Sequence, residues 1–287
     1  MNAPRKLRLV IAKGRIYKSV AQLLHDAGVQ FHANDRDYRV TVSNLEIEIK
    51  MMKPQNIPKL IELGSHDAGF TGKDWIVETA SNVEEVMDLG FDPVSIVVAV
   101  PEEITPEQLR RQQLVVASEY AHIATSFLDR QGYDYVLLKT FGATEVFPPD
   151  DADMIIDNTS TGRTLQEHHL KIIQTIMTSS TRFITNRAVL DDPWKTEKIH
   201  QMRLLFESTL AARERVMLEM NVPKEHFDET IKILPCMRSP TVAPLYGEAG
   251  YAVKVAVKKG EVIHLIPRLK TLGVTDILEY ELRKVIA

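Results

Sequence analysis

The chain has 287 residues, 44% of them hydrophobic and 26% charged, a composition typical of a globular protein with two or three domains. Its formal net charge of -4 argues against a general nucleic-acid-binding protein, because such a protein needs a basic face. No apolar run approaches the roughly 20 residues that span a membrane, and the N-terminal residues contain no apolar signal-peptide core. The single cysteine, Cys236, excludes an internal disulfide. We therefore expect a cytoplasmic protein that binds neither membranes nor nucleic acids.

Strand-like apolar runs alternate with amphipathic segments over the first two thirds of the chain. The predicted strands cover residues 7–12, 38–42 and 45–49 (a hairpin), 67–72, 94–100, 114–117, 135–138, 154–156 and 182–185. The predicted helices cover residues 17–27, 58–63, 120–131 and about 195–218. This alternation predicts α/β architecture with open sheets, in which ligands bind at the carboxyl ends of the strands.

The pattern changes after the long helix. Strands at 217–222, 241–246, 251–257 and 276–282 enclose helices at 224–233 and 261–272, in the order β-α-β-β-α-β. This is the order of a ferredoxin-like module, and its length is enough for an independent domain. We place the domain boundary near residue 217.

The most informative segment runs from Met154 to Leu165. An apolar strand end is followed by the acid Asp157, a series of hydroxyl residues, Gly162 and a helix-permissive segment. Backbone N–H groups of such a loop converge on one concavity, to which the next helix adds the positive end of its dipole. The segment therefore predicts a phosphate-binding loop formed by Asn158, Thr159, Ser160, Thr161, Gly162, Arg163 and Thr164. An ordinary strand-to-helix turn would explain one or two of these hydroxyls.

From Leu7 to the C-terminus the sequence resembles the long form of ATP phosphoribosyltransferase, the first enzyme of histidine biosynthesis. The loop alone would indicate any protein that binds phosphoribosyl pyrophosphate (PRPP), whereas an ordered set of matching segments is more specific. That set comprises Lys13-Gly14-Arg15, residues 67–74, residues 88–91, residues 142–145, residues 157–165 and Ser239-Pro240-Thr241.

The resemblance implies a catalytic part with two lobes like those of periplasmic binding proteins, and an active site between them. Lobe I would comprise residues 1–97 with 182–215, lobe II residues 98–181 with the PRPP loop, and a regulatory histidine-binding domain residues 216–287. The implied reaction joins N1 of the adenine of ATP to C1′ of PRPP and releases pyrophosphate in the presence of Mg²⁺. A homo-oligomer that exchanges between dimer and hexamer is also implied, with histidine as inhibitor and AMP as a further one.

Breaking the bond from C1′ to pyrophosphate builds positive charge on the ribose and negative charge on the leaving group. Catalysis then depends on positioning and electrostatic preorganisation. We expect Glu145, Asp157 and Arg15 to be catalytic, with Glu145 and Asp157 serving ribose hydroxyls or a Mg²⁺-linked water. The expected ATP-binding residues are Lys13, Arg15, Lys53, Lys73, Asp74 and Tyr120.

Several of these residues would also suit a purely structural role. Lys13 and Arg15 fit surface charges after a strand, Glu145 fits an acid favoured by a helix dipole, and Tyr120 fits a core aromatic. The family pattern is broken at Lys53, Asn56, Phe141 and His168-His169, where Arg, Asp, a polar residue and Asn or Gly are commoner. On a helix, the two histidines would point about 100° apart and could not easily share a metal ion.

The implied histidine site lies around the turn from Cys236 to Thr241. Ser239 and Thr241 supply hydroxyls, Met237 can pack on an imidazole ring, and Asn221 ends the first strand of the module. Alternatively, Ser239-Pro240 only ends one helix and begins one strand. For the whole chain, the competing functions are a two-lobed solute-binding protein, a ligand-sensing regulator and another PRPP-dependent transferase.

Overall fold

The computed structural model describes residues 5–33, 38–43, 46–105, 107–237 and 239–286. It divides into two compact units, of which the first comprises Met1–His25 with Val29–His200 and the second Asp26–Gly28 with Gln201–Ala287. The long helix α6 (Pro193–Arg213) contributes to both units. None of the described helices is both long and apolar enough to cross a membrane.

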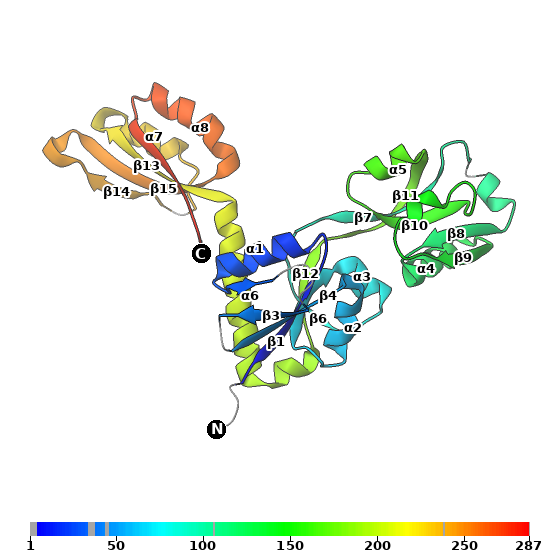
Figure 1. Ribbon diagram of the computed structural model, residues 1–287. Coiled ribbons are helices and arrows are strands. Elements are labelled where there is room, and N and C mark those ends of the chain that lie inside the picture. The colour runs from blue at the N-terminus through cyan, green and yellow to red at the C-terminus, as the bar shows by residue number, and fades with distance from the viewer. Residues whose placement is uncertain (1–4, 34–37, 44–45, 106, 238, 287) are drawn as a thin grey trace. The chain divides into compact units, whose positions relative to one another are not determined.

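The first unit contains two sheets: in Figure 1 the strands of the first are blue to cyan, apart from the yellow-green β12, and those of the second are teal to green. The first sheet has the strand order β2-β3-β4-β1-β5-β12-β6 and the second the order β11-β7-β10-β8-β9. The strands of the first are β1 (Leu7–Ala12), β2 (Phe31–His32), β3 (Arg39–Val42), β4 (Ile47–Met52), β5 (Ala68–Gly72), β6 (Glu84–Asp88) and β12 (Thr181–Thr185). Those of the second are β7 (Val94–Pro101), β8 (Leu114–Ser118), β9 (Tyr135–Lys139), β10 (Met154–Thr159) and β11 (Leu170–Ser179). The chain thus completes the second sheet before it returns to the first as β12.

Short helices connect these strands. They are α1 (Tyr17–Ala27), α2 (Ile57–Glu62), α3 (Lys73–Glu78), α4 (Ala121–Gln131) and α5 (Arg163–Glu167). Gly69 allows β5 to approach β1, because a Cβ atom at this position would lie 2.6 Å from Val10 Cγ1. Phe70 and Phe183 stack across β5 and β12 with ring centroids 5.0 Å apart. In the second sheet, β7 is buried over most of its length and is one of the core strands.

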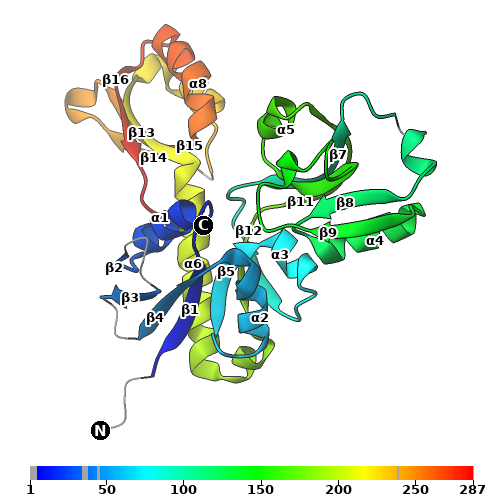
Figure 2. The same ribbon diagram turned by 45° about the vertical axis from the view of Figure 1, so that its right-hand side comes forward.

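The second unit has the strand order β14-β15-β13-β16, with antiparallel pairing throughout. Its elements after α6 are β13 (Arg215–Pro223), α7 (Phe227–Ile233), β14 (Thr241–Pro244), β15 (Gly250–Lys258), α8 (Lys259–Thr271) and β16 (Thr275–Glu281). Alternate residues of β13 are buried, and they form one core with side chains of α8 and residues packed from α7. Both helices cover the same face of the sheet, as Figure 2 shows for α8.

The predicted α/β class with two lobes and a C-terminal β-α-β-β-α-β module is confirmed. The helix predicted over 195–218 was wrong at its C-terminal end, since α6 stops at Arg213. Period-two burial of Val216, Leu218 and Met220 places these residues in β13 instead. His168 and His169 lie between α5, which ends at Glu167, and β11, and His169 has a φ of +55°. In the predicted hairpin, Asn44 and Leu45 lie outside the described residues.

A buried carboxylate, Asp67, links the first sheet to α6. Asp67 is 1% exposed, and its oxygens accept hydrogen bonds from Arg8 at 2.8 Å and from Lys195 Nζ at 2.8 Å. Burial alone would raise the pKa of Asp67, but the hydrogen bonds from Arg8 and Lys195 outweigh it and lower the pKa. This carboxylate therefore stabilises the fold above its unfolded-state pKa, and the contribution is lost as the pH falls through the folded-state value.

Lys195→Met is expected to reduce the free energy of unfolding by about 1–2 kcal/mol at neutral pH, because one charged donor to Asp67 is lost. Lys198→Met is the matched control on the same helix, since Lys198 pairs with Glu46 at the surface and should contribute less than about 1 kcal/mol. Urea unfolding of both variants at pH 7 and pH 3 measures the difference. An equal loss for the two variants at pH 7 would contradict the role of Lys195.

Candidate active site

The predicted phosphate loop connects β10 to α5 and lines a cavity of about 350 Å³. Two of its hydroxyls fix the loop from within: Thr159 Oγ1 accepts a hydrogen bond from Gly162 N at 2.9 Å, and Thr161 Oγ1 accepts one from Arg163 N at 3.4 Å. Gly162 has φ +77° and ψ −4°, a left-handed conformation that side chains rarely adopt. The loop residues that line the cavity are Asp157, Asn158, Thr159, Ser160, Thr161, Arg163 and Thr164.

Three carboxylates line the same cavity: Asp157, Glu145 and Glu119. Burial, together with the negative charges of Glu119 and Glu145, raises the pKa of Asp157 to about 6. Hydrogen bonds from Thr144 and from the backbone N–H of Asn158 oppose this shift. A carboxylate with a raised pKa among like charges is a strong acceptor for hydroxyl groups and a favourable neighbour for a cation.

Two further cavities, of about 550 Å³ and 170 Å³, are lined by the predicted ATP-binding residues and their neighbours. Lys53 lines the larger one, and Lys13, Arg15, Asp74 and Tyr120 line the smaller one. Arg15 also lines the cavity of the phosphate loop, so the smaller cavity shares a cation with it. The structure thus brings most of the predicted site residues around three cavities with shared lining.

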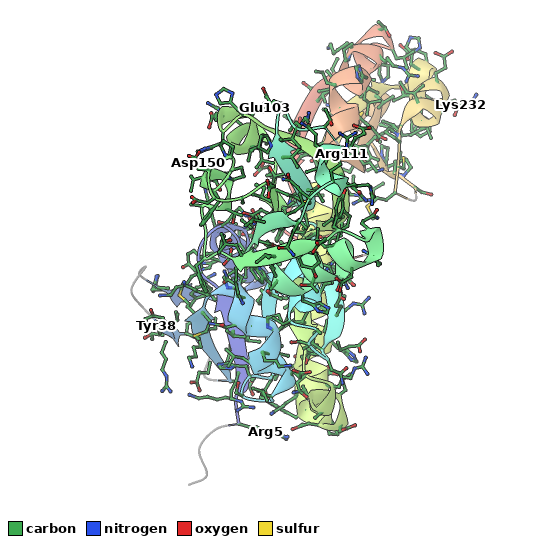
Figure 3. All side chains as sticks on the ribbon, turned by 90° about the vertical axis from the view of Figure 1, so that its right-hand side faces the viewer. Arg5, Tyr38, Glu103, Arg111, Asp150 and Lys232 are labelled. Carbon is green, nitrogen blue, oxygen red and sulfur yellow. The ribbon has the colours of Figure 1, made fainter. Side chains whose placement is uncertain are left out.

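Two of these cations have contacts that fix their positions. Arg15 Nη1 donates a hydrogen bond to the carbonyl oxygen of Asp92 at 2.9 Å. Lys13 Nζ lies 3.8 Å from the ring centroid of Tyr38, an exposed residue at the edge of the first lobe in Figure 3. The ring quadrupole attracts the ammonium group and holds it over the aromatic face.

Tyr120 and Asp74 are buried and bonded to each other. Tyr120 is 1% exposed, and its Oη donates a hydrogen bond to Asp74 Oδ2 at 2.8 Å. Asp74 Oδ1 accepts a further hydrogen bond from Ser179 Oγ at 2.6 Å. Burial, followed by the charge of Asp74, raises the pKa of Tyr120 far above its ordinary value, so the phenol stays protonated.

Lys73 and Asp74 form the first turn of α3. Lys73 forms an ion pair with Glu85 and lies outside the three cavities. Several lining residues were not predicted from the sequence, above all Glu119, Gln55 and Trp75.

Glu119 is the most prominent of the missed residues because it lines all three cavities. A signal for it was present in the strand pattern. β8 and β10 are parallel neighbours with Ser118 opposite Ile156, so Glu119, directly after β8, and Asp157, in the second half of β10, lie at the same edge of the sheet. An acid directly after a buried strand is the pattern that identified Asp157.

The predicted histidine-site residues belong to the second unit. Asn221 Nδ2 donates a hydrogen bond to Asp276 Oδ2 at 2.8 Å, while Met237, Ser239 and Thr241 are exposed. In the register of the sheet, Asn221 pairs with Ala252, which pairs with Ala243, two residues after Thr241. Asn221 and Thr241 therefore share the face of the sheet that points away from α7 and α8. Arg238, within the same turn, lies outside the described residues.

A cavity lined by a hydroxyl-rich loop and carboxylates, on a two-lobed α/β fold, is typical of enzymes that act on phosphorylated substrates. Comparison with known families narrows this class. The family model described as ATP phosphoribosyltransferase matches residues 53–208, and the one described as HisG, C-terminal domain, matches residues 212–284. The chain belongs to the long form of the ATP phosphoribosyltransferase family, pentosyltransferases that carry out the first step of histidine biosynthesis.

Individual relatives of this chain carry the same family name. The chain is 37% identical to the ATP phosphoribosyltransferase of Chlorobaculum parvum over 291 residues, covering 99% of both chains. It is also 37% identical to the enzyme of Thermodesulfovibrio yellowstonii, covering 98% of both chains. Among solved structures, an ATP phosphoribosyl transferase (HisG:HisZ) complex from Thermotoga maritima matches the fold with a TM-score of 0.63. That match has 22% identity and covers 70% of this chain and 98% of the other.

Proposed function

We propose that this protein transfers the 5-phosphoribosyl group of PRPP to N1 of the adenine of ATP. The bond between C1′ and N1 forms while the bond from C1′ to the pyrophosphate oxygen breaks, and pyrophosphate leaves with the electron pair. The observation that carries the proposal is the shared lining of the phosphate-loop cavity and the two neighbouring cavities. The adenine of ATP must reach C1′ of PRPP, so the two substrates need adjoining cavities such as these.

The roles of the residues follow from their chemistry. Residues 158–164 bind the 5-phosphate, because loop N–H groups and hydroxyls are its natural donors. Asp157 and Glu145 accept hydrogen bonds from the ribose hydroxyls, and Arg15 stabilises the leaving pyrophosphate from its position on two cavities. No side chain acts as nucleophile, since the attacking atom belongs to the adenine.

The ATP phosphates require cations. Lys53 and Lys13 line the cavities next to the phosphate loop, and Lys73 remains a weaker candidate because it is paired with Glu85. The burial of Tyr120 and Asp74 supports a positioning role, in which they hold α3 against the start of α4.

A divalent metal fits the site as a companion of the substrate. Among the described residues, no group of three His, Cys, Asp or Glu side chains is arranged to hold a metal ion. Mg²⁺ commonly uses one or two carboxylates plus substrate phosphates, and Asp157 and Glu145 line the loop cavity together. Bound Mg²⁺ would neutralise charge on the pyrophosphate, while Asp157 and Glu145 would hold it through oxygen ligands or water.

The test of the reaction is a spectrophotometric assay of the N1-ribosylated adenine product. The purified protein, ATP, PRPP and Mg²⁺ are combined with a pyrophosphatase that pulls the reaction forward. Product formation that needs all of these substrates is the expected result. Turnover of a free base such as orotate in place of ATP would identify another PRPP-dependent transferase. Binding without any turnover would indicate a solute-binding protein.

We also propose that the second unit senses histidine, with Asn221, Met237, Ser239 and Thr241 as contacts. The exposed hydroxyls of Ser239 and Thr241, and the shared sheet face of Asn221 and Thr241, support this assignment. Inhibition from this unit requires two global states of different histidine affinity. Histidine is then non-competitive with PRPP and favours a hexamer over a dimer of this cytoplasmic enzyme. AMP is proposed as a second inhibitor.

The double variant Ser239→Ala, Thr241→Val is expected to weaken histidine binding about tenfold or more, because hydrogen bonds to the charged amino acid are lost. Isothermal titration calorimetry of histidine into the full-length protein measures this. Thr271→Val serves as the control, because Thr271 is an exposed hydroxyl residue at the end of α8, which covers the opposite face of the sheet. Equal histidine affinity in the double variant and the intact protein would show that the site is wrong.

A further inference from the structure

Gln55 and Glu119 form a hydrogen-bonded pair that lines both cavities beside the phosphate-loop cavity. Gln55 Nε2 donates a hydrogen bond to Glu119 Oε1 at 3.0 Å. Gln55 Oε1 is buried and meets no hydrogen-bond donor within the described part of the chain. A buried acceptor without a donor costs free energy, and the Glu119 carboxylate has further lone pairs to offer. The pair is therefore equipped to receive a ligand that brings N–H donors.

Aromatic side chains indicate that this ligand is flat. Trp75 lines the same two cavities and is held by stacking on Tyr120, with ring centroids 4.5 Å apart and an interplanar angle of 24°. Phe141 lines the larger cavity and is 88% exposed, which is unusual for a large apolar side chain that has no ligand to cover. A planar heteroaromatic ring can pack against such surfaces.

The cations of the larger cavity indicate that the flat ligand also carries phosphates. Lys53 and Lys139 line this cavity together with Gln55 and Glu119. Lysine ammonium groups bind phosphates as point charges. The acceptor oxygens of Gln55 and Glu119 cannot bind phosphates and are left for another part of the ligand. The lining therefore suits a nucleotide whose base carries an amino group toward Gln55 and Glu119.

We infer that Glu119 and Gln55 accept hydrogen bonds from the 6-amino group of adenine and thereby select ATP over nucleotides with a 6-oxo base. The inference rests on the proposed function and names the residues that determine its base specificity. A 6-amino group offers two N–H donors, one for the Glu119 carboxylate and one for Gln55 Oε1. A 6-oxo group would instead place an acceptor oxygen next to the Glu119 carboxylate and Gln55 Oε1. A site whose acceptors need N–H donors from the ligand strongly rejects an analogue that lacks them.

The charge of Glu119 also suits the chemical step. When N1 attacks C1′, positive charge spreads over N1, C6 and the 6-amino nitrogen. A carboxylate beside this nitrogen stabilises that charge more in the transition state than in the bound substrate, so it raises kcat. Glutamine at this position would keep an acceptor but lose the charge.

The test compares binding of ATP and inosine 5′-triphosphate (ITP) to the full-length protein by calorimetry. In Glu119→Gln, ATP binding should weaken about tenfold or more while ITP binding holds or strengthens, because the new amide can donate to the 6-oxo group. Turnover with ATP and PRPP should show a lower kcat. Glu103→Gln is the matched control, an exposed glutamate on the surface of the second lobe that Figure 3 labels. It should behave as the intact protein does.

A second variant distinguishes recognition of the base from a purely structural role, in which the Gln55–Glu119 hydrogen bond only joins the two lobes. Gln55→Met keeps the length of the side chain but removes both its acceptor and its hydrogen bond to Glu119. Weaker ATP binding with unchanged ITP binding supports the inference. An equal change for both nucleotides in the two variants, or an unchanged ATP preference in Glu119→Gln, overturns it. The proposed function fails separately, if the intact protein forms no product from ATP and PRPP.

Discussion

Replacement of Gly162 by valine is expected to weaken PRPP binding by more than about a hundredfold. The left-handed conformation of Gly162, with φ at +77°, costs a β-branched residue at least roughly 1–2 kcal/mol, so the loop must rearrange. Rearrangement would turn the loop N–H groups away from the position that we propose for the 5-phosphate. Thr161→Ala should act more mildly, with a loss of about tenfold to a hundredfold, because one hydroxyl is removed.

Gly132→Val provides the matched control for this experiment. Gly132 has φ +68°, ends α4 in the same lobe, and a Cβ atom there would meet nothing within 4 Å. Both glycine variants therefore have backbone strain, but only Gly162→Val changes the predicted phosphate loop. Calorimetry with PRPP and Mg²⁺ measures the affinities. If Gly162→Val and Thr161→Ala both bind PRPP as the intact protein does, the phosphate-loop assignment is refuted.

Asp157→Asn is expected to lose most of the turnover and yet to unfold at a higher temperature at pH 7. The carboxylate that we propose as acceptor for the ribose hydroxyls is also costly to ionise in its partly buried position, which raises its pKa to about 6. The folded protein therefore binds this proton more tightly than the unfolded chain does. Its stability decreases as the pH rises from about 4 through 6, where the folded-state carboxyl ionises.

Asparagine removes that penalty and keeps an acceptor for the hydroxyl of Thr144. The expected gain is on the order of 1–3 kcal/mol at pH 7 and close to zero at pH 4. Thermal unfolding at both pH values measures it, with Asp150→Asn, an exposed aspartate of the same lobe labelled in Figure 3, as the control. A destabilised Asp157→Asn at pH 7 would contradict the account.

The same pKa predicts the pH dependence of substrate capture. With Asp157 as an acceptor for ribose hydroxyls, kcat/KM for PRPP should fall as the pH drops below about 6. In Asp157→Asn this dependence should disappear. A wild-type profile that is flat between pH 5 and 8 would argue against ionised Asp157 in the free enzyme.

The sequence predicted those parts of the site that lie in one continuous segment. Residues 157–164 follow an apolar strand in an order with one strong physical interpretation, and the structure has them around one cavity apart from Gly162, which shapes the loop. Glu119 and Gln55 could not be found in this way. They lie 64 positions apart, and their meaning depends on a hydrogen bond that only the folded chain forms.

The errors in the fold have a similar origin. The helical pattern around α6 runs without a glycine or proline into β13, so only the burial of alternate residues marks the change at Arg215. The ten-residue strand β11 has two irregularities in its pairing with β7, which interrupt the alternation that would have identified it. Such boundaries depend on the partner strand, and the partner is distant in the sequence.

The position of β12 determines the order in which the two sheets can be completed on the ribosome. β12 lies between β5 and β6 in the first sheet, although it follows β6 by about ninety residues in the chain. At a synthesis rate of roughly 5–20 residues per second, β5 and β6 wait several seconds for the strand that joins them. The second sheet is built from one continuous stretch, β7 to β11, and needs no later segment. The lobe that carries the proposed PRPP loop is therefore expected to become resistant to protease on the nascent chain before the lobe that begins the protein.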